Sequence, residues 1–264
     1  MKEFEYVLVI VLGLCFGSFA NVCILRSLHN ESFGGRSHCP SCSKQLAWFD
    51  LIPVLSFLLL QGQCRYCKSK ISFQYPLVEA ACALIWFAIY LHTDWGISFI
   101  LYAGFAFFTL MIVVTDYLSS DVYVWMIICG LLIVIPCQLL LGQLQFLLWG
   151  VLVAAGICLF MSCVNYLLKK FRGYDEAFGM GDILYIFLLG TAVGPIGVFS
   201  VVFGALLLFI LICLLQKRPG NRLRQQFPLC PAFGLALLLE PYLPGGFIGT
   251  YIGVLDAAAR FVGG

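Results

Sequence analysis

The feature that most constrains this chain is a series of long, continuous apolar segments. They alternate with short polar stretches, and 62% of the residues are hydrophobic while only 11% are charged. Only helices and closed barrels satisfy their backbone polar groups in lipid, and continuous rather than alternating apolar runs favour helices. The segments cover residues 5–25, 76–93, 96–115, 122–141, 144–168, 183–194, 196–215 and 231–252. The sequence therefore predicts an all-α polytopic membrane protein with about eight transmembrane helices.

Two of these segments have unusual ends. The first could be mistaken for a cleaved signal peptide, but Lys2, Glu3 and Glu5 give its start no positive excess and no small-residue cleavage site follows. We therefore expect a retained span. The segment at 183–194 is short and is followed by Pro195, which predicts a tight turn or a broken helix there.

The placement of basic residues predicts the orientation. The net charge of +2 is uninformative, and we expect no nucleic-acid partner. Thirteen of the fifteen Lys and Arg residues fall in the polar stretches 26–74, 169–182 and 216–230, which share one side if the segments alternate. By the positive-inside rule this side is the cytoplasm, and both termini lie outside.

The first basic stretch carries two Cys-x-x-Cys pairs, formed by Cys39 with Cys42 and by Cys64 with Cys67. Four thiolates in this spacing are typical of a closed, structural zinc site. Disulfides or a redox pair are the alternatives, and a cytoplasmic position argues against stable disulfides. The other nine cysteines stand singly in or beside apolar runs, where we expect small buried hydrophobes. Residues 51–60, between the pairs, are too short to span and predict a re-entrant or interfacial segment packed on the helix bundle.

Two aspartates stand at the ends of apolar segments. Asp116 ends the third segment, and Asp182 opens the sixth after Gly179 and Gly181, which allow close backbone approach. The alternative for this glycine motif is a loop with a capping aspartate. The predicted topology places both carboxylates on the cytoplasmic side. Two carboxylates close together share a proton, and they can activate water for attack on a peptide carbonyl as in aspartic proteases.

Two further acidic residues lie near the ends of apolar segments. Asp121 is a rival to Asp116, although an N-cap of the next segment also explains it. Glu79 lies near the start of the second segment; it either reaches the interface or faces the bundle or a cofactor.

These motifs, in this order, resemble the type IV prepilin peptidases, which are membrane aspartyl proteases, over almost the whole chain. The matching stretches are Gly17-Ser18-Phe19-Ala20-Asn21-Val22 with Arg26, the two cysteine pairs, Tyr75-Pro76-Leu77-Val78-Glu79, Thr115-Asp116 and Gly179-Met180-Gly181-Asp182. The resemblance implies that Asp116 and Asp182 are catalytic and that residues 179–182 and Glu79 support the site. It supplies the preference for Asp116 over Asp121.

The resemblance also implies a substrate and a location. The family removes a short basic leader from prepilins or pseudopilins at the cytoplasmic face of the bacterial inner membrane. Many members then methylate the new N-terminus with S-adenosylmethionine. We expect residues 1–75 to form the first span with a zinc-binding, methyltransferase-related loop, and 76–264 to form the protease bundle. Roles in type IV pili, type II secretion and competence all fit.

The chain departs from the family pattern near the aspartates. Val122-Tyr123-Val124 replaces the usual Ile-Pro-Asp or Ile-Pro-Asn, and Leu184 replaces a frequent lysine. Near the C-terminus, residues 227–233 loosely match a Pro-Phe-Gly-Pro segment. These departures keep a catalytically weakened assembly partner as an alternative. An ion-coupled carrier is a second alternative, although no clear internal repeat supports it, and a membrane thiol oxidoreductase is a third.

Overall fold

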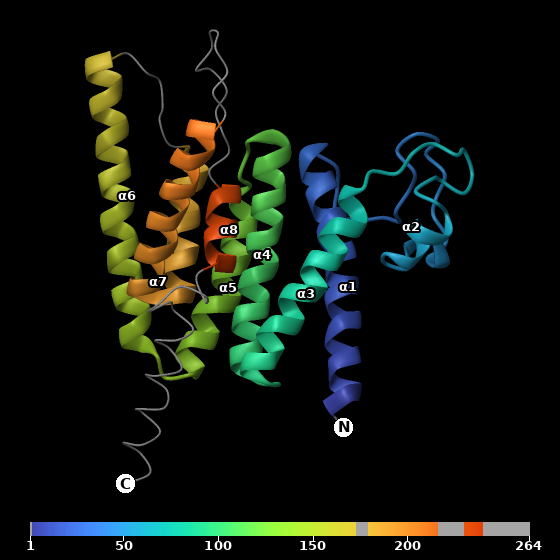
Figure 1. Ribbon diagram of the computed structural model, residues 1–264, viewed down its shortest axis with the longest axis horizontal. Helices are drawn as coiled ribbons and strands as arrows, with labels where there is room; N and C mark the ends of the chain where they lie inside the picture. Colours follow the sequence, from blue (N-terminus) through green and yellow to red (C-terminus); the bar gives the residue numbers. More distant parts are fainter. Residues whose placement is uncertain (1, 173–178, 216–229, 240–264) are drawn as a thin grey trace. The chain divides into compact units, whose positions relative to one another are not determined.

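The computed structural model describes residues 2–172, 179–215 and 230–239. In these ranges the regular secondary structure is helical (Figure 1). The elements are α1 (Lys2–Leu28), the 3-10 helix η1 (Trp48–Leu51), α2 (Leu55–Leu59), α3 (Gln74–Thr93), α4 (Ile97–Ser119), α5 (Val124–Leu140), α6 (Leu144–Arg172), α7 (Met180–Leu215) and α8 (Cys230–Leu239). The chain divides into two compact units, Met1–Thr115 and Asp116–Gly264. The division at 75/76 made from the sequence follows function rather than compactness, and it stays a prediction.

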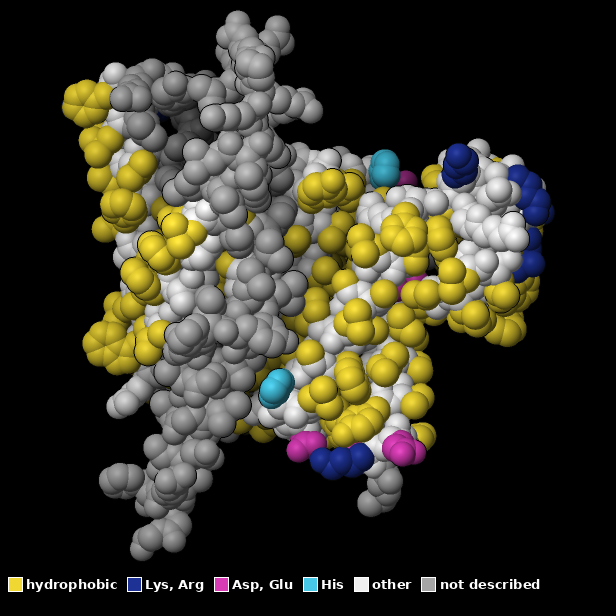
Figure 2. All heavy atoms as spheres, in the orientation of Figure 1, with side chains coloured by type: hydrophobic (Ala, Val, Ile, Leu, Met, Phe, Trp, Pro, Cys, Tyr) yellow, Lys and Arg dark blue, Asp and Glu magenta, His cyan; other side chains and the backbone are white. Residues whose placement is uncertain are grey.

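Several helices are long and apolar enough to cross a bilayer, so this is a multi-pass membrane protein. The candidate spans are α1, α3, α4, residues 144–171 of α6 and residues 180–207 of α7, and α5 is a shorter apolar helix. Hydrophobic side chains lie on the outside of the helices (Figure 2), as expected for surfaces that contact lipid. The first five predicted segments are confirmed as α1, α3, α4, α5 and α6. Residues 240–252 of the eighth lie outside the described residues.

The sixth and seventh predicted segments are two helices within α7, which meet at Gly194, where the backbone is not helical (φ 69°, ψ −171°). The predicted break is therefore confirmed. Pro195 has no backbone N–H, so the carbonyl of Thr191 loses its normal helical donor. The buried side chain of Gln138 replaces it, because its Nε2 donates to the Thr191 carbonyl at 3.2 Å and to the Ala192 carbonyl at 3.3 Å. A polar residue on α5 thus makes the break in α7 tolerable in lipid.

In the first unit, α1 and α3 pack closely along the Gly-Ser-Phe-Ala-Asn-Val motif. A Cβ atom on Gly17 would lie 2.6 Å from the Cα of Glu79, so only glycine fits this contact. Asn21 donates through its Nδ2 to the Tyr75 carbonyl at 3.1 Å. Arg26 donates to the carbonyls of Phe33 and Gly35 and fixes the chain as it leaves α1. This motif therefore joins the two spans that flank the cysteine loop, residues 29–73.

Candidate functional site

Three side chains meet in the second unit, on three different helices. One carboxylate oxygen of Asp116, one of Asp182 and the Sγ of Cys230 all lie within 4.8 Å of one another. Asp116 is 5% exposed and Cys230 is fully buried. The predicted pair of aspartates is thus brought together, although they are 66 positions apart in the sequence.

Asp116 lies in the last turn of α4 and is held by the start of α8. The backbone N–H of Cys230 donates to its Oδ2 at 3.0 Å. Cys230 is the first residue of α8, and the N–H groups of a first helical turn have no partner within their own helix. They also carry the positive end of the helix dipole, which favours a carboxylate at this position. Pro231 fits this arrangement, because proline is tolerated in a first turn.

Asp182 lies in the first turn of α7 and makes two contacts. Its carboxylate accepts a hydrogen bond from the backbone of Gly179, which immediately precedes the helix. This reach-back is the pattern of an acidic third residue in a capping box. The thiol of Cys230 donates to its Oδ1 at 3.2 Å. The capping alternative for this motif is therefore correct in part, but the same carboxylate also faces Asp116.

The second glycine of the motif is required by packing. A Cβ atom on Gly181 would lie 2.5 Å from the Cβ of Val122, which precedes α5. Contacts this short do not occur, so a larger residue would displace either segment. Gly179 is exposed and has no such steric requirement. Gly181 therefore sets the distance between the start of α7 and the Val122 segment, one residue before Asp182.

Asp121, a candidate from the sequence, lies outside the cluster, and Cys230, which was not a candidate, lies within it. Asp121 is exposed and is not part of the cluster of ligand atoms found among the described residues. Cys230 was missed, because it was counted with the nine single cysteines as a buried hydrophobe. Its only signal was its position in the segment 227–233, of which residues 227–229 lie outside the described residues.

The cysteine loop contains a second cluster, formed by four thiols. The Sγ atoms of Cys39, Cys42, Cys64 and Cys67 lie within 4.8 Å of one another, which suits a metal ion. The first cysteine of each pair is buried and the second is exposed.

Both pairs form the same backbone turn. The N–H of Cys39 donates to the Lys44 carbonyl, and the N–H of Ser43 donates back to the Cys39 carbonyl. The N–H of Cys64 donates to the Ser69 carbonyl, and the N–H of Lys68 donates back to the Cys64 carbonyl. Ser43 and Lys68 both have positive φ values, 55° and 60°. The two Cys-x-x-Cys turns thus have the same backbone conformation, and each directs its two thiols toward the common cluster.

The thiols differ in acidity. Burial raises the pKa of Cys39, but hydrogen bonds from the backbone of Cys42 and Ser41 outweigh it and lower the pKa to about 6. Hydrogen bonds from the side chain and backbone of Ser69 lower the pKa of Cys67. These two thiolates form readily, which fits a site that binds a cation through sulfur.

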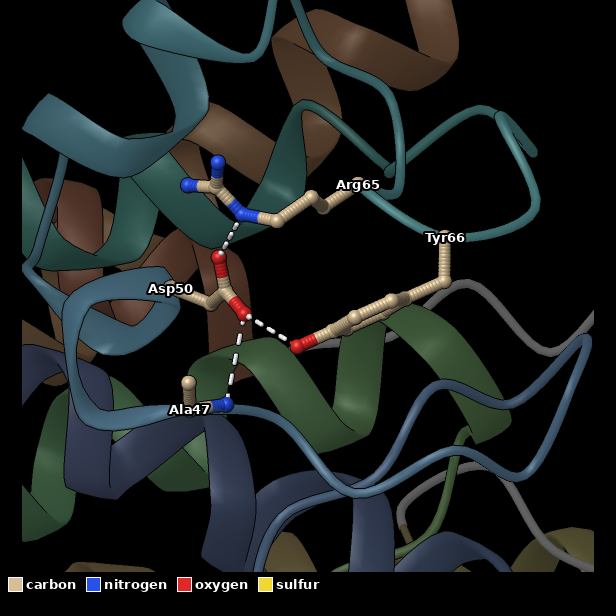
Figure 3. A network of polar contacts seen from close by, with 4 residues as sticks. All are labelled: Ala47, Asp50, Arg65 and Tyr66. Atoms are coloured by element: carbon tan, nitrogen blue, oxygen red, sulfur yellow. Dashed lines mark hydrogen bonds and ion pairs between the residues drawn. The ribbon is translucent and has the colours of Figure 1, made fainter.

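Other contacts fix the loop between the two cysteine pairs. Asp50 accepts hydrogen bonds from Nε of Arg65 at 2.7 Å, from the hydroxyl of Tyr66 at 3.3 Å and from the backbone N–H of Ala47 at 3.2 Å (Figure 3). Glu79, which is buried in α3, accepts the backbone N–H of Val54 at 2.7 Å. Of its two alternatives, Glu79 therefore faces the protein, where it holds the segment before α2.

Comparison with known proteins gives consistent similarities. Residues 11–93 match the family described as Bacterial Peptidase A24 N-terminal domain. The chain is 35% identical to a prepilin leader peptidase/N-methyltransferase of Vibrio cholerae, over 72% of this chain and 79% of that protein. It is 31% identical to a type 4 prepilin-like proteins leader peptide-processing enzyme of Escherichia coli, over 91% and 95%. It is 30% identical to a prepilin leader peptidase/N-methyltransferase of Bacillus subtilis, over 92% and 96%. No solved structure matches the chain.

Proposed function

Because this chain belongs to the type IV prepilin peptidase family, we propose that it removes leader peptides from prepilins or pseudopilins, using Asp116 and Asp182 as its catalytic pair. The observation that carries the proposal is the meeting of these two carboxylates in a largely buried site. The Gly-x-Gly-Asp motif and the Thr-Asp motif each supply one of them.

The proposed reaction is a general acid–base hydrolysis. One carboxylate is ionised and takes a proton from water, which attacks the carbonyl carbon of the scissile peptide bond. The other carboxylate is protonated; it polarises the carbonyl through a hydrogen bond to the carbonyl oxygen and then transfers its one proton to the leaving amine, so the pair ends with its protonation states exchanged. Cys230 acts as a positioning residue, because its backbone holds Asp116 and its thiol holds Asp182.

The site is proposed to lie at the cytoplasmic face of the bacterial inner membrane. The support is the concentration of Lys and Arg in three polar stretches of the sequence, one of which contains the Gly-x-Gly-Asp motif. A prepilin whose apolar helix remains in the bilayer would present its basic leader at this depth.

We assign structural zinc to the four thiols of the cysteine loop. A tetrahedral zinc site with Zn–S bonds of about 2.3 Å separates its sulfurs by roughly 3.8 Å, and the Sγ atoms of Cys39 and Cys67 are 3.9 Å apart. All four ligands come from protein, so the ion would stabilise the loop and leave no position for a substrate.

N-methylation is a second proposed activity, and it rests on the names of the relatives from Vibrio cholerae and Bacillus subtilis. Transfer of labelled methyl groups from S-adenosylmethionine to a cleaved prepilin tests it. Label on the new N-terminus is the expected result, and cleaved but unlabelled product would limit the protein to peptidase activity.

The peptidase proposal is tested by cleavage of a prepilin-like substrate in membranes. Asp116→Asn and Asp182→Asn should each abolish cleavage, because each removes one acid–base group. Asp121→Asn is the matched control, since Asp121 is an exposed aspartate close in sequence, and it should cleave normally. Continued cleavage by either of the first two variants, or no cleavage of any prepilin by the wild type, would favour an assembly partner or a carrier.

A further inference from the structure

The cysteine loop exposes a group of large apolar side chains that neither the thiol cluster nor the aspartates explain. They come from η1, the residue after it, α2 and the residue before α3. Trp48 is 76% exposed and Leu59 is 73% exposed. The group, called the apolar surface below, consists of Trp48, Ile52, Leu55, Leu58, Leu59 and Phe73. Proteins that face only water rarely expose such a run of neighbouring apolar side chains.

The loop is tethered to the membrane at both ends. It leaves α1 after Leu28 and enters α3 at Gln74, and both helices are candidate spans. The apolar surface therefore cannot move far from the bilayer. Since α2 contains only five residues, it is too short to cross the bilayer.

The charges of the loop are arranged around this surface. Figure 2 shows hydrophobic side chains on the lower side of the cysteine loop, where Figure 1 draws α2, and Lys and Arg side chains along the upper and outer edge. The exposed basic residues are Arg36, Lys44, Arg65, Lys68 and Lys70.

The loop's acidic side chains do little to offset this positive charge. Glu31 and Asp50 are the only acidic residues between 29 and 73. The side chain of Asp50 is 3% exposed and is bonded to Arg65 and Tyr66. Four thiolates with one zinc ion would add two negative charges, which still leaves the loop net positive, and the exposed Lys and Arg side chains at its edge complement anionic lipid headgroups.

The apolar surface is also held in a fixed shape. Asp50 joins η1 to the second cysteine pair (Figure 3), and the Arg65 guanidinium lies 4.9 Å from the centre of the Phe49 ring. Glu79 joins the residue before α2 to α3. Contacts within the protein thus hold the backbone that carries the apolar side chains, so their arrangement does not require a bound partner.

We propose that the apolar surface inserts into the interfacial layer of an anionic leaflet, while the basic edge contacts lipid headgroups. Trp48 is placed as an interfacial tryptophan, with an apolar ring system and one polar N–H. Leu58 and Leu59 contribute the buried apolar area. The inference goes beyond peptide cleavage, because it assigns a lipid-binding role to a part of the chain outside the spans and the aspartate pair.

The test measures the depth of Trp48 in the full-length protein, reconstituted into vesicles of brominated phosphatidylcholine with phosphatidylglycerol. The chain has five tryptophans, so the Trp48 signal is the difference between the wild type and Trp48→Phe. Bromines near the glycerol end of the acyl chains should quench this signal about twofold more than bromines at the bilayer centre, because interfacial groups lie ~5–10 Å into the headgroup and acyl boundary. Aqueous iodide should quench it weakly.

A second variant separates insertion from loop folding. Leu58→Asp combined with Leu59→Asp should abolish quenching of Trp48 by brominated lipid and expose it to iodide. Gln61→Asp is the control, since it adds a charge beside the surface at an exposed polar residue, and it should behave as the wild type. Strong iodide quenching of wild-type Trp48 without lipid quenching would overturn the proposal. Protection from both quenchers would also overturn it, because a second protein chain would then cover the surface.

Discussion

Replacing Cys230 with alanine should slow peptide cleavage about tenfold. The substitution removes the thiol that donates to Asp182 at 3.2 Å, but it keeps the backbone N–H that donates to Asp116 at 3.0 Å. Hydrogen bonds to charged groups contribute about 1.5–3 kcal/mol, and a thiol is a weak donor, so the lower value applies. A loss of about 1.5 kcal/mol in the transition state corresponds to about a tenfold lower rate.

The assay measures kcat and KM for a prepilin substrate with purified protein in lipid. Loss of a group that orients Asp182 should lower kcat and leave KM nearly unchanged, because the thiol is buried between the aspartates and does not hold the substrate. Cys230→Ser keeps a hydrogen-bond donor at the same position. Its kcat should therefore fall by no more than half as much as the kcat of Cys230→Ala. Thermal unfolding of both variants controls for stability.

Two results would refute this reasoning. If Cys230→Ala cleaves at the wild-type rate, the thiol does not orient Asp182. If alanine and serine lower kcat equally, the volume of the sulfur matters and its hydrogen bond does not. Neither result would contradict the proposed catalytic role of Asp116 and Asp182, which the asparagine variants test separately.

Three further predictions concern packing, metal and the loop. Gly181→Ala should lower cleavage at least about fivefold, because overpacking costs about 1–3 kcal/mol, and adding Val122→Ala should restore much of the rate; an unaffected single variant would contradict the close contact. Cys64→Ser should release the bound zinc, measured by atomic emission on the purified protein, since three thiolates do not close a structural site; full zinc retention would contradict the assignment. Glu79→Gln should speed amide exchange at Val54 about fivefold, measured by mass spectrometry, because a neutral acceptor bonds more weakly by about 1 kcal/mol; unchanged exchange would show that the N–H is protected by other contacts.

Much of the fold could be predicted because lipid leaves few options. A continuous apolar run must form a helix there, so α1, α3, α4, α5 and α6 follow directly from hydropathy. The break in α7 followed from Gly194 and Pro195. The way in which the break is tolerated did not, because the Gln138 side chain that replaces the missing donor comes from a distant helix.

The candidate site was predictable in its carboxylates and not in its thiol. An aspartate at the end of an apolar run is costly and therefore conspicuous, which singled out Asp116 and Asp182. A cysteine among apolar residues costs little free energy to bury, because it behaves as a small hydrophobic residue, so its position in the sequence does not indicate a functional site. Only the fold brings the first residue of α8 to both carboxylates and so distinguishes Cys230 from the other single cysteines. The cysteine pairs were predictable because their spacing encodes the turn locally.

The burial of Cys230 has a practical consequence for chemical labelling. Alkylating reagents attack accessible thiolates, and a buried thiol in this position reacts slowly. Cys42 and Cys67 in the cysteine loop are exposed. Inactivation by a maleimide would therefore report damage to the cysteine loop well before it reported modification beside the aspartates.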